Sequence, residues 1–368
     1  MGINSALGSS ALLPAGLGFR NKIINGDMRI AQRGTATITG SSSVQYPVDR
    51  WAVYNGTGTV TFAQSTDAPA GFNASLNATV TATGSYSTSG YTQITHKIEG
   101  FNCQDLAYGT SSAKTVVLSF WSKSSVVGTQ NVSFKNSGNN RVYVATYTID
   151  AANTWEKKIV TVVGDTTGTW LVDSGIGLEV TFNLGMGTTY DVTAGSWQAA
   201  AAKYSTSGAI DFAANSGATF YITGLQLEQN LQPTPFEQRP FSVELNLCKR
   251  YYETTYNYGT PAGTATSDGA FYHGGISDGS GYVYLTTMLS TPKRVEVAAG
   301  QSGSYGVKFY TTGGTVNQAL YIRSATSGAS TTLGVNVPSR ILLCVYMQVG
   351  ATWVPTLVYF HYVYDVEL

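Results

Sequence analysis

The sequence is poor in charge, and it holds no long apolar run. Only 11% of its 368 residues are charged, against about a quarter in ordinary globular proteins. Its 21 basic residues balance its 21 acidic ones, and no Lys/Arg-rich block occurs. This balance argues against nucleic acid and against an anionic membrane surface as main partners. No stretch approaches the roughly 20 apolar residues of a spanning helix, so we expect no membrane insertion.

Cysteine and histidine are scarce as well, which leaves little material for metal or redox chemistry. Cys103, Cys248 and Cys344 are odd in number and widely separated, so they form no disulfide framework and no Cys-x-x-Cys zinc motif. The apolar neighbours of Cys248 and Cys344 predict buried thiols, whereas the polar setting of Cys103 leaves its state open. The three histidines are scattered and form no His-x-x-x-His pair. We therefore predict neither a metal nor a cofactor.

Signatures of catalysis are missing too. The Gly-x-Ser-x-Gly pattern at Gly275–Gly279 runs into more turn residues and then a strand-like segment, so it favours a hairpin turn over a nucleophile elbow. No phosphate-binding loop occurs, and no repeat of about 20–30 residues indicates a β-helical array. Asp and Glu are few and spread out, although the sequence leaves open whether two of them converge for glycan cleavage. We predict that the protein is not an enzyme.

The first 20 residues lack the basic region and the long apolar stretch of a signal peptide, so we expect a soluble protein made in the cytoplasm. They are small, rich in Gly, Ala and Ser, and too few to fold alone. Such a terminus is either frayed or ordered by docking onto something larger. The apolar side chains available for docking are Leu12, Leu13, Leu17 and Phe19.

From Asn21 onward, apolar residues recur with a period of two rather than 3.6. Strand-length runs such as 116–121, 143–149 and 178–184 are separated by clusters of Gly, Asn, Asp and Ser. Many short strands with such connections predict an all-β protein whose first domain, residues 21–235, is an antiparallel sandwich of the jelly-roll type. Within it, only Trp197–Lys203 hints at a helical turn.

A proline-rich stretch marks the end of this first domain. Three prolines within residues 232–240 predict an extended linker. The best helix candidate of the chain follows, at Ser242–Tyr252, with Ser242 as its cap. We assign residues 236–252 to the linker and this short helix. The apolar face of the helix would carry Leu245, Cys248 and Tyr252.

Strand patterns return in residues 253–368, which we predict to form a distal β-sandwich domain. Its last strand, within Thr356–Leu368, has apolar and aromatic side chains on both faces. One face carries Val358, Phe360, Tyr362 and Tyr364, and the other carries Tyr359, His361, Val363 and Asp365. A strand of this kind is covered twice, by its own domain and by another layer or subunit. We therefore expect a homo-oligomer.

Aromatic residues are abundant, with six tryptophans and 24 tyrosines. Their rings present a flat apolar face and a polar edge, as sugar-stacking sites require. Trp51, Trp121 and Trp155 lie in strand patterns, which favours core packing for them. A cluster at and after the end of the predicted helix forms either an interface or a glycan-binding patch, and the sequence does not decide between them. The cluster consists of Tyr251, Tyr252, Tyr256 and Tyr258.

A series of motifs runs in order through most of the chain. It comprises Asn21–Thr35 (NKIINGDMRIAQRGT), Val48–Trp51, Leu118–Ser125, Thr154–Trp170, Gly224–Gln229, the stretch TPFEQRPFSVELNLCKRYYE at 234–253, Thr286–Val297 and Tyr364–Leu368. Together these motifs resemble a family of bacteriophage and prophage structural proteins, the tail fibres and other virion-surface fibres, in which the first motif looks like an opening strand. The first domain also resembles the galactose-binding-like jelly rolls of carbohydrate-binding modules.

The resemblance implies a virion protein, most simply a homotrimeric tail fibre made in the host cytoplasm. Residues 1–20 would dock it to other virion proteins, and the distal domain would face the host. Host attachment would then be non-covalent, through many weak contacts with surface glycan. Two alternatives stay open from the sequence. One is a capsid decoration or head fibre protein, and the other is a polysaccharide-depolymerising tailspike.

Overall fold

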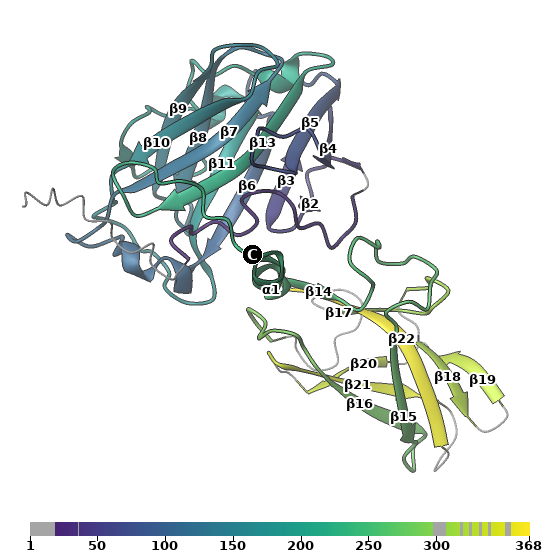
Figure 1. The fold of residues 1–368 in the computed structure, drawn as a ribbon. Helices are drawn as coiled ribbons and strands as arrows, with labels where there is room; N and C mark the ends of the chain where they lie inside the picture. The colour runs from purple at the N-terminus through teal and green to yellow at the C-terminus, as the bar shows by residue number, and fades with distance from the viewer. Residues whose placement is uncertain are drawn as a thin grey trace, which may run out of the picture.

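Two antiparallel β-sandwiches follow one another along the chain, with helix α1 (Phe241–Lys249) between them (Figure 1). The all-β fold predicted from the period of two is confirmed. The computed structural model describes residues 19–35, 37–296, 307–316, 319–323, 326–330, 333–337, 340–349 and 355–368. Of the helices in these ranges, none is long and apolar enough to cross a membrane.

The first sandwich consists of a six-stranded and a seven-stranded sheet, here called sheet A and sheet B. Sheet A has the order β1 (Ile38–Thr39), β4 (Thr59–Ser65), β5 (Ser75–Ala82), β13 (Thr219–Glu228), β7 (Val116–Ser124) and β10 (Glu156–Val162). Sheet B has the order β12 (Trp197–Gln198), β9 (Val142–Ile149), β8 (Gly128–Lys135), β11 (Ile176–Met186), β6 (Tyr91–Glu99), β3 (Trp51–Asn55) and β2 (Gln45–Val48). The chain crosses repeatedly from one sheet to the other, as in a jelly roll.

Aromatic side chains from both sheets fill the space between them. Phe120 of sheet A and Phe182 of sheet B are fully buried, and their ring centroids lie 5.1 Å apart in an edge-on arrangement. Trp51 is fully buried beside Phe182, as its place in a strand predicts. Each large ring removes about 150–250 Å² of surface from water, so this layer supplies much of the stability of the first sandwich.

The distal domain is organised around one long strand, β22 (Pro355–Asp365). One edge of β22 pairs with β14 (Tyr252–Thr254) and β15 (Phe271–Ile276). The other edge pairs with β17 (Val307–Tyr310) and β18 (Ala319–Arg323), and β18 pairs in turn with β19 (Thr326–Ser330). A second sheet has the order β16 (Tyr282–Met288), β21 (Leu342–Gln348) and β20 (Leu333–Val337).

The two faces of β22 are covered in different ways. Its inner residues Val358, Phe360, Tyr362 and Tyr364 are buried in the core of the distal domain. On the outer face, His361 is also buried, because the ring of Tyr256 stacks on it at a centroid distance of 3.8 Å. Around His361, the outer face of β22 is therefore covered by another part of the same chain. No second subunit is required to cover this half of the strand. Farther along the outer face, Leu357 remains 40% exposed.

Two local predictions were wrong. Helix α1 starts at Phe241 and ends at Lys249, and Pro240 occupies its N-cap position without a side-chain hydrogen bond from Ser242. Tyr252 begins β14 instead of continuing the helix. Trp197–Lys203 is not helical, because Trp197 pairs with Tyr143 in sheet B and Ala202 adopts a left-handed backbone with φ of 51°. Here strand pairing overrides the helix propensity of a run of alanines.

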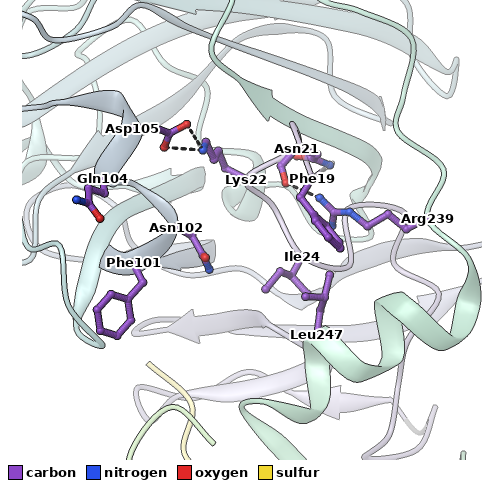
Figure 2. A pocket seen from close by; sticks show the side chains of 10 residues that line it. All are labelled: Phe19, Asn21, Lys22, Ile24, Phe101, Asn102, Gln104, Asp105, Arg239 and Leu247. Atoms are coloured by element: carbon purple, nitrogen blue, oxygen red, sulfur yellow. Dashed lines mark hydrogen bonds and ion pairs between the residues drawn. The ribbon is translucent and has the colours of Figure 1, made fainter. Parts of the chain in front are cut away.

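Four short 3₁₀ turns complete the described secondary structure. They are η1 (Gly100–Asn102), η2 (Gln104–Leu106), η3 (Thr188–Tyr190) and η4 (Phe212–Ala214). The first two follow β6 directly and lie on the side of the first sandwich that faces helix α1 (Figure 2). They form one wall of a pocket.

Candidate functional site

Most of the chain's sequence motifs meet where the two sandwiches join. The first motif, Asn21–Thr35, is not the opening strand that its resemblance implied, because Asn25 and Met28 have left-handed φ values of 57° and 59°. Its backbone is held by side chains instead. The Asn25 amide donates to the carbonyl oxygens of Ile30 and Asp49 at 2.9 and 2.8 Å, and its Oδ1 accepts from the Ile30 N–H at 2.9 Å. The motif is therefore a stapled loop.

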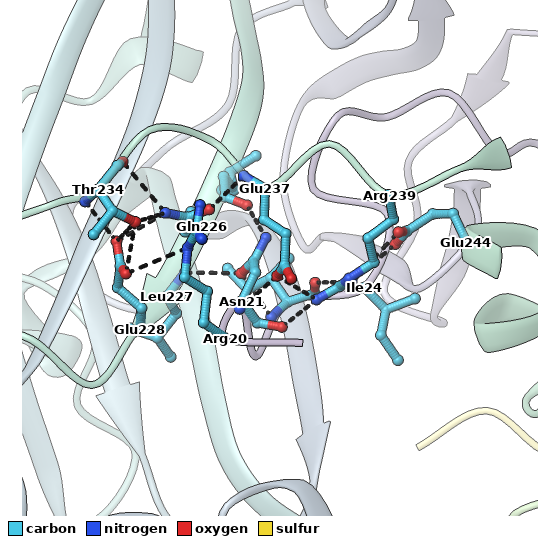
Figure 3. A network of polar contacts seen from close by, with 12 residues as sticks. Arg20, Asn21, Ile24, Gln226, Leu227, Glu228, Thr234, Glu237, Arg239 and Glu244 are labelled. Atoms are coloured by element: carbon cyan, nitrogen blue, oxygen red, sulfur yellow. Dashed lines mark hydrogen bonds and ion pairs between the residues drawn. The ribbon is translucent and has the colours of Figure 1, made fainter. Parts of the chain in front are cut away.

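The proline-rich linker is fastened to this loop (Figure 3). Asn21 donates through Nδ2 to the Leu225 carbonyl at 2.9 Å, and the Glu237 carboxylate accepts from the Asn21 N–H at 2.9 Å. Arg239 forms ion pairs with Glu237 and Glu244, both at 3.3 Å, and donates to the carbonyl oxygens of Asn21 and Ile23. The stretch that leaves β13 is thus held against the start of the chain instead of hanging free.

A second group of charges joins the first sandwich to the C-terminus of the chain. Arg50 is fully buried, and its guanidinium forms an ion pair with Glu367 and donates to the Lys97 carbonyl at 2.6 Å. Arg33 lies beside it and pairs with Asp365 at 3.2 Å and with Glu367 at 3.4 Å. We call Arg33, Arg50, Asp365 and Glu367 the junction charges.

Two further ion pairs flank the junction charges. Arg250, just after helix α1, donates to Glu99 of β6 at 2.8 Å, and the Tyr251 hydroxyl donates to the same carboxylate at 2.8 Å. Lys293 is fully buried, pairs with Glu253 of β14 and donates to the Lys249 carbonyl at 2.6 Å. Because a buried charge is costly unless it is paired, the Arg250–Glu99 pair ties the end of helix α1 to the first sandwich, and the Lys293 contacts tie the same end of the helix to the distal domain.

Three of the four clustered tyrosines belong to this junction, and Tyr256 packs within the distal domain. Tyr251 and Tyr252 are buried, and the guanidinium carbons of Arg50 and Arg33 lie 3.5 and 3.7 Å from their ring centroids. Tyr256 is buried under its stack with His361. The hydroxyl of Tyr258 donates to the Arg29 carbonyl at 2.8 Å. Tyr251, Tyr252 and Tyr258 therefore lie at an interface within the chain, and the ring of Tyr258 stays 48% exposed. The three buried rings leave no free face for a sugar.

A pocket of about 720 Å³ opens beside the same junction (Figure 2). Phe101 on η1 lies on one side of it, and Phe19 at the start of the described chain lies on the other side together with Ile24 and Leu247. Lys22 donates to Asp105 at 2.7 Å on its wall. The full lining is Phe19, Asn21, Lys22, Ile24, Phe101, Asn102, Gln104, Asp105, Arg239 and Leu247. Of the residues predicted to dock, Phe19 is here, while Leu12, Leu13 and Leu17 lie outside the described residues.

A second candidate surface lies on the outer face of sheet A. Lys123, Tyr221 and Asn77 stand directly opposite one another on the neighbouring strands β7, β13 and β5. Trp155, in the connection between β9 and β10, has its ring 6.1 Å from that of Tyr221, and its Nε1 donates to Asp67 at 3.0 Å. We call Asp67, Asn77, Lys123, Trp155 and Tyr221 the outer-face group.

The rings of the outer-face group are half-buried and are held in place by charge. Lys123 pairs with Asp67, and its ammonium lies 4.4 Å from the Tyr221 ring centroid. The hydrogen bond from Lys123 holds the pKa of Asp67 below its ordinary value, so this carboxylate stays ionised. The prediction of core packing is wrong for Trp155, which precedes β10, and for Trp121, which points away from the core beside the buried Phe120.

Ser277, the serine of the Gly-x-Ser-x-Gly pattern, lies in a turn. Ser277 is buried in a tight turn, where Asp278 accepts from the N–H groups of Ser280 and Tyr282 at 2.9 Å. This turn carries the chain from β15 in one sheet to β16 in the other, so it is not the predicted hairpin. Within the described ranges, no group of three His, Cys, Asp or Glu side chains is placed to hold a metal ion.

Two of the three cysteines and His96 are buried. All three cysteines are free, Cys103 and Cys248 are buried, and Cys344 is only half-buried, contrary to the prediction for it. Burial raises the pKa of Cys103 to about 12, so its thiol stays protonated. His96 is fully buried against the Ile24 backbone, and burial holds its pKa well below the ordinary value.

Comparison with known proteins gives only distant likenesses. No family model matches the chain, and no curated protein matches it. Among solved structures, the enzymatically active domain of bacteriophage CBA120 tailspike protein 4 is 14% identical over 57% of this chain, with a TM-score of 0.34, and the match spans 21% of that protein. A family 11 carbohydrate-binding module from Clostridium thermocellum is 14% identical over 53% of this chain and 98% of its own, with a TM-score of 0.28.

A third solved structure is the N-terminal cellulose-binding domain of Cellulomonas fimi β-1,4-glucanase C. It is 12% identical over 50% of this chain and 90% of its own, with a TM-score of 0.25. Likeness at these values concerns the fold at most, and it says nothing of what this chain binds.

The junction charges predict a large difference between two neighbouring acidic residues. Glu367→Gln should lower the free energy of unfolding by about 3–5 kcal/mol, because it leaves the buried Arg50 without its counter-charge. Asp365→Asn removes a partner of Arg33 that is 44% exposed, and it should cost less than about 1 kcal/mol. Urea unfolding followed by tryptophan fluorescence measures both. Equal costs for the two variants would contradict the role assigned to Glu367.

The junction also predicts a dependence of stability on pH. Burial raises the pKa of Asp49 to about 6, above the roughly 3.9 of an unfolded chain. The folded protein therefore holds this proton to a higher pH, so the stability that Asp49 contributes is present below about pH 4 and is lost as pH rises through about 6. The loss is at most about 1.4 kcal/mol per pH unit.

Urea unfolding of the wild type and of Asp49→Asn at several pH values measures this effect. The wild type should lose stability relative to the variant between about pH 4 and about pH 6. The exposed Asp268→Asn is the control for replacing a surface carboxylate by an amide. A wild type that instead gains stability over Asp49→Asn as pH rises would show that the pKa is lowered.

Proposed function

We propose that this chain is a surface-fibre protein of a bacteriophage virion that attaches to its host by non-covalent contacts with glycan. The outer-face group of sheet A carries the proposal. It offers the half-exposed rings of Trp155 and Tyr221 together with the Asp67 carboxylate, the Lys123 ammonium and the Asn77 amide. Sugars present apolar C–H faces and a rim of hydroxyls, which such a mixture of rings and polar groups matches.

The geometry of the outer-face group suits binding more than reaction. Asp67 is held ionised by Lys123 and by the Trp155 N–H, so it accepts hydrogen bonds and does not serve as a general acid. The Trp155 indole and the Tyr221 phenol are held in place before a ligand arrives, which lowers the entropy lost on binding. We therefore propose a binding protein that is not an enzyme.

The virion role rests on the series of motifs and on the low charge of the whole surface. In this proposal residues 1–20 dock the protein to other virion proteins, and three copies form the fibre. Tyr272, Ile276 and Leu357 are exposed along the part of the β15–β22 sheet that the chain does not cover itself. An uncharged strip of this kind suits contact between subunits. Three copies would multiply weak glycan contacts into useful avidity.

Substitutions in the outer-face group test the glycan contact. Trp155→Ala should reduce binding of the purified protein to host polysaccharide by up to about tenfold, since contact with an aromatic ring is worth about 0.5–1.5 kcal/mol. Ile159→Ala is the matched control, because Ile159 is 52% exposed on β10 of the same sheet and should bind like the wild type. Isothermal titration calorimetry or a glycan array measures the change. Equal binding by both variants would remove the outer-face group from the proposal.

The place in the particle and the absence of catalysis have their own tests. Immunogold labelling of virions should decorate the tail or another fibre, whereas label over the whole capsid would favour a decoration protein. Incubation with host polysaccharide should release no reducing ends. If such ends appeared and disappeared again in an Asp67→Asn variant, the protein would be a depolymerase and the proposal of pure binding would fail.

A further inference from the structure

We propose that the pocket beside helix α1 is the seat of the chain's own N-terminal segment, residues 1–18, in the free protein. The described chain begins at Phe19, and the ring of Phe19 itself lines the pocket (Figure 2). The segment that precedes it therefore enters the fold at the mouth of a cavity of about 720 Å³. This inference goes beyond the proposed glycan contact and does not depend on it.

The lining calls for an apolar occupant. Phe101 and Phe19 are 52% and 58% exposed, which is unusual for phenyl rings standing on either side of one cavity. Leu247 adds half-buried aliphatic surface on the side of Phe19, where the buried Ile24 lies beside it. Covering these exposed side chains would remove apolar surface from water. Residues 1–18 carry suitable side chains at Leu12, Leu13 and Leu17.

The charges around the pocket favour a neutral occupant. Lys22 is paired with Asp105, and Arg239 is paired with Glu237 and Glu244. The two cations that line the cavity, Lys22 and Arg239, are thus already neutralised within the chain by three anions. A charged ligand would have to displace one of these partners, and displacement of a buried partner is costly. Residues 1–18 contain no Asp, Glu, Lys or Arg.

The tether between the segment and the pocket is short. At about 3.3–3.6 Å per extended residue, Leu17 stays within about 7 Å of Phe19 and Leu13 within about 22 Å. A segment attached this closely meets its own pocket at a far higher effective concentration than a segment from another molecule. We therefore assign the pocket to the segment of the same chain. Docking of these leucines on another virion protein would require that they first leave this seat.

Hydrogen exchange on the full-length chain tests the seat from the side of the pocket. The N–H groups of Phe101 and Cys103 form hydrogen bonds with the carbonyl oxygens of Asp173 and Gly100, both at 2.9 Å, and so report local opening of η1. The triple variant Leu12→Ser, Leu13→Ser, Leu17→Ser should exchange these amides about tenfold faster than the wild type. The control Ala6→Ser, Ala11→Ser, Ala15→Ser changes the same segment without removing a leucine and should match the wild type.

Proteolysis tests the same seat from the side of the segment. Phe101→Ser removes an exposed ring and should speed chymotryptic cleavage at the leucines of residues 1–18, whereas Ile159→Ser, on an equally exposed side chain of sheet A, should not. Equal exchange in the wild type and the leucine variant, with equal cleavage in both serine variants, would overturn the proposal. If protection of the η1 amides from exchange vanished on dilution and size exclusion showed dimers, the segment would bind to a neighbouring copy. That result would also overturn the proposal.

Discussion

The buried ion pair between Arg50 and Glu367 is the interaction on which the arrangement of the molecule depends. Arg50 belongs to the first sandwich, and Glu367 is the penultimate residue of the chain. A buried arginine is tolerated only when a counter-charge and further acceptors reach it. Here they come from the far end of the sequence, so the junction is complete only when both domains have folded and the last strand is in place. In a chain with so few charges, several of the charged residues are concentrated at this junction.

This placement changes what the sequence resemblance means. Segments that carry the resemblance, such as Asn21–Thr35, Val48–Trp51 and Tyr364–Leu368, supply the stapled loop, Arg50 and Glu367 of the junction. They build the joint between the two sandwiches. Two other motifs, Leu118–Ser125 and Thr154–Trp170, supply Lys123 and Trp155 of the outer-face group, so the resemblance covers both the joint and part of this surface. Trp155 and Tyr221, which we assign to glycan contact, owe their position to sheet register and to a connection between strands.

The strands and the single helix region were predictable because local patterns decide them. Alternating apolar residues marked runs such as 116–121, and the prolines before Phe241 marked the approach to the helix. The stapled loop was not predictable, because its shape comes from hydrogen bonds between Asn25 and residues that the sequence does not pair with it. The roles of Tyr251 and Tyr252 were left open for the same reason. Their arginine partners lie about 200 residues earlier in the chain, and only the fold brings them together.

Residual dipolar couplings of the backbone amides, measured on the full-length protein, test most directly whether the junction makes one rigid body. If the buried ion pairs fix the domains, couplings from the first sandwich and from the distal domain should fit one alignment tensor with the orientation seen in Figure 1. Two tensors of different magnitude or orientation would show that the domains move independently. In that case the buried charges would not hold the molecule together as argued here.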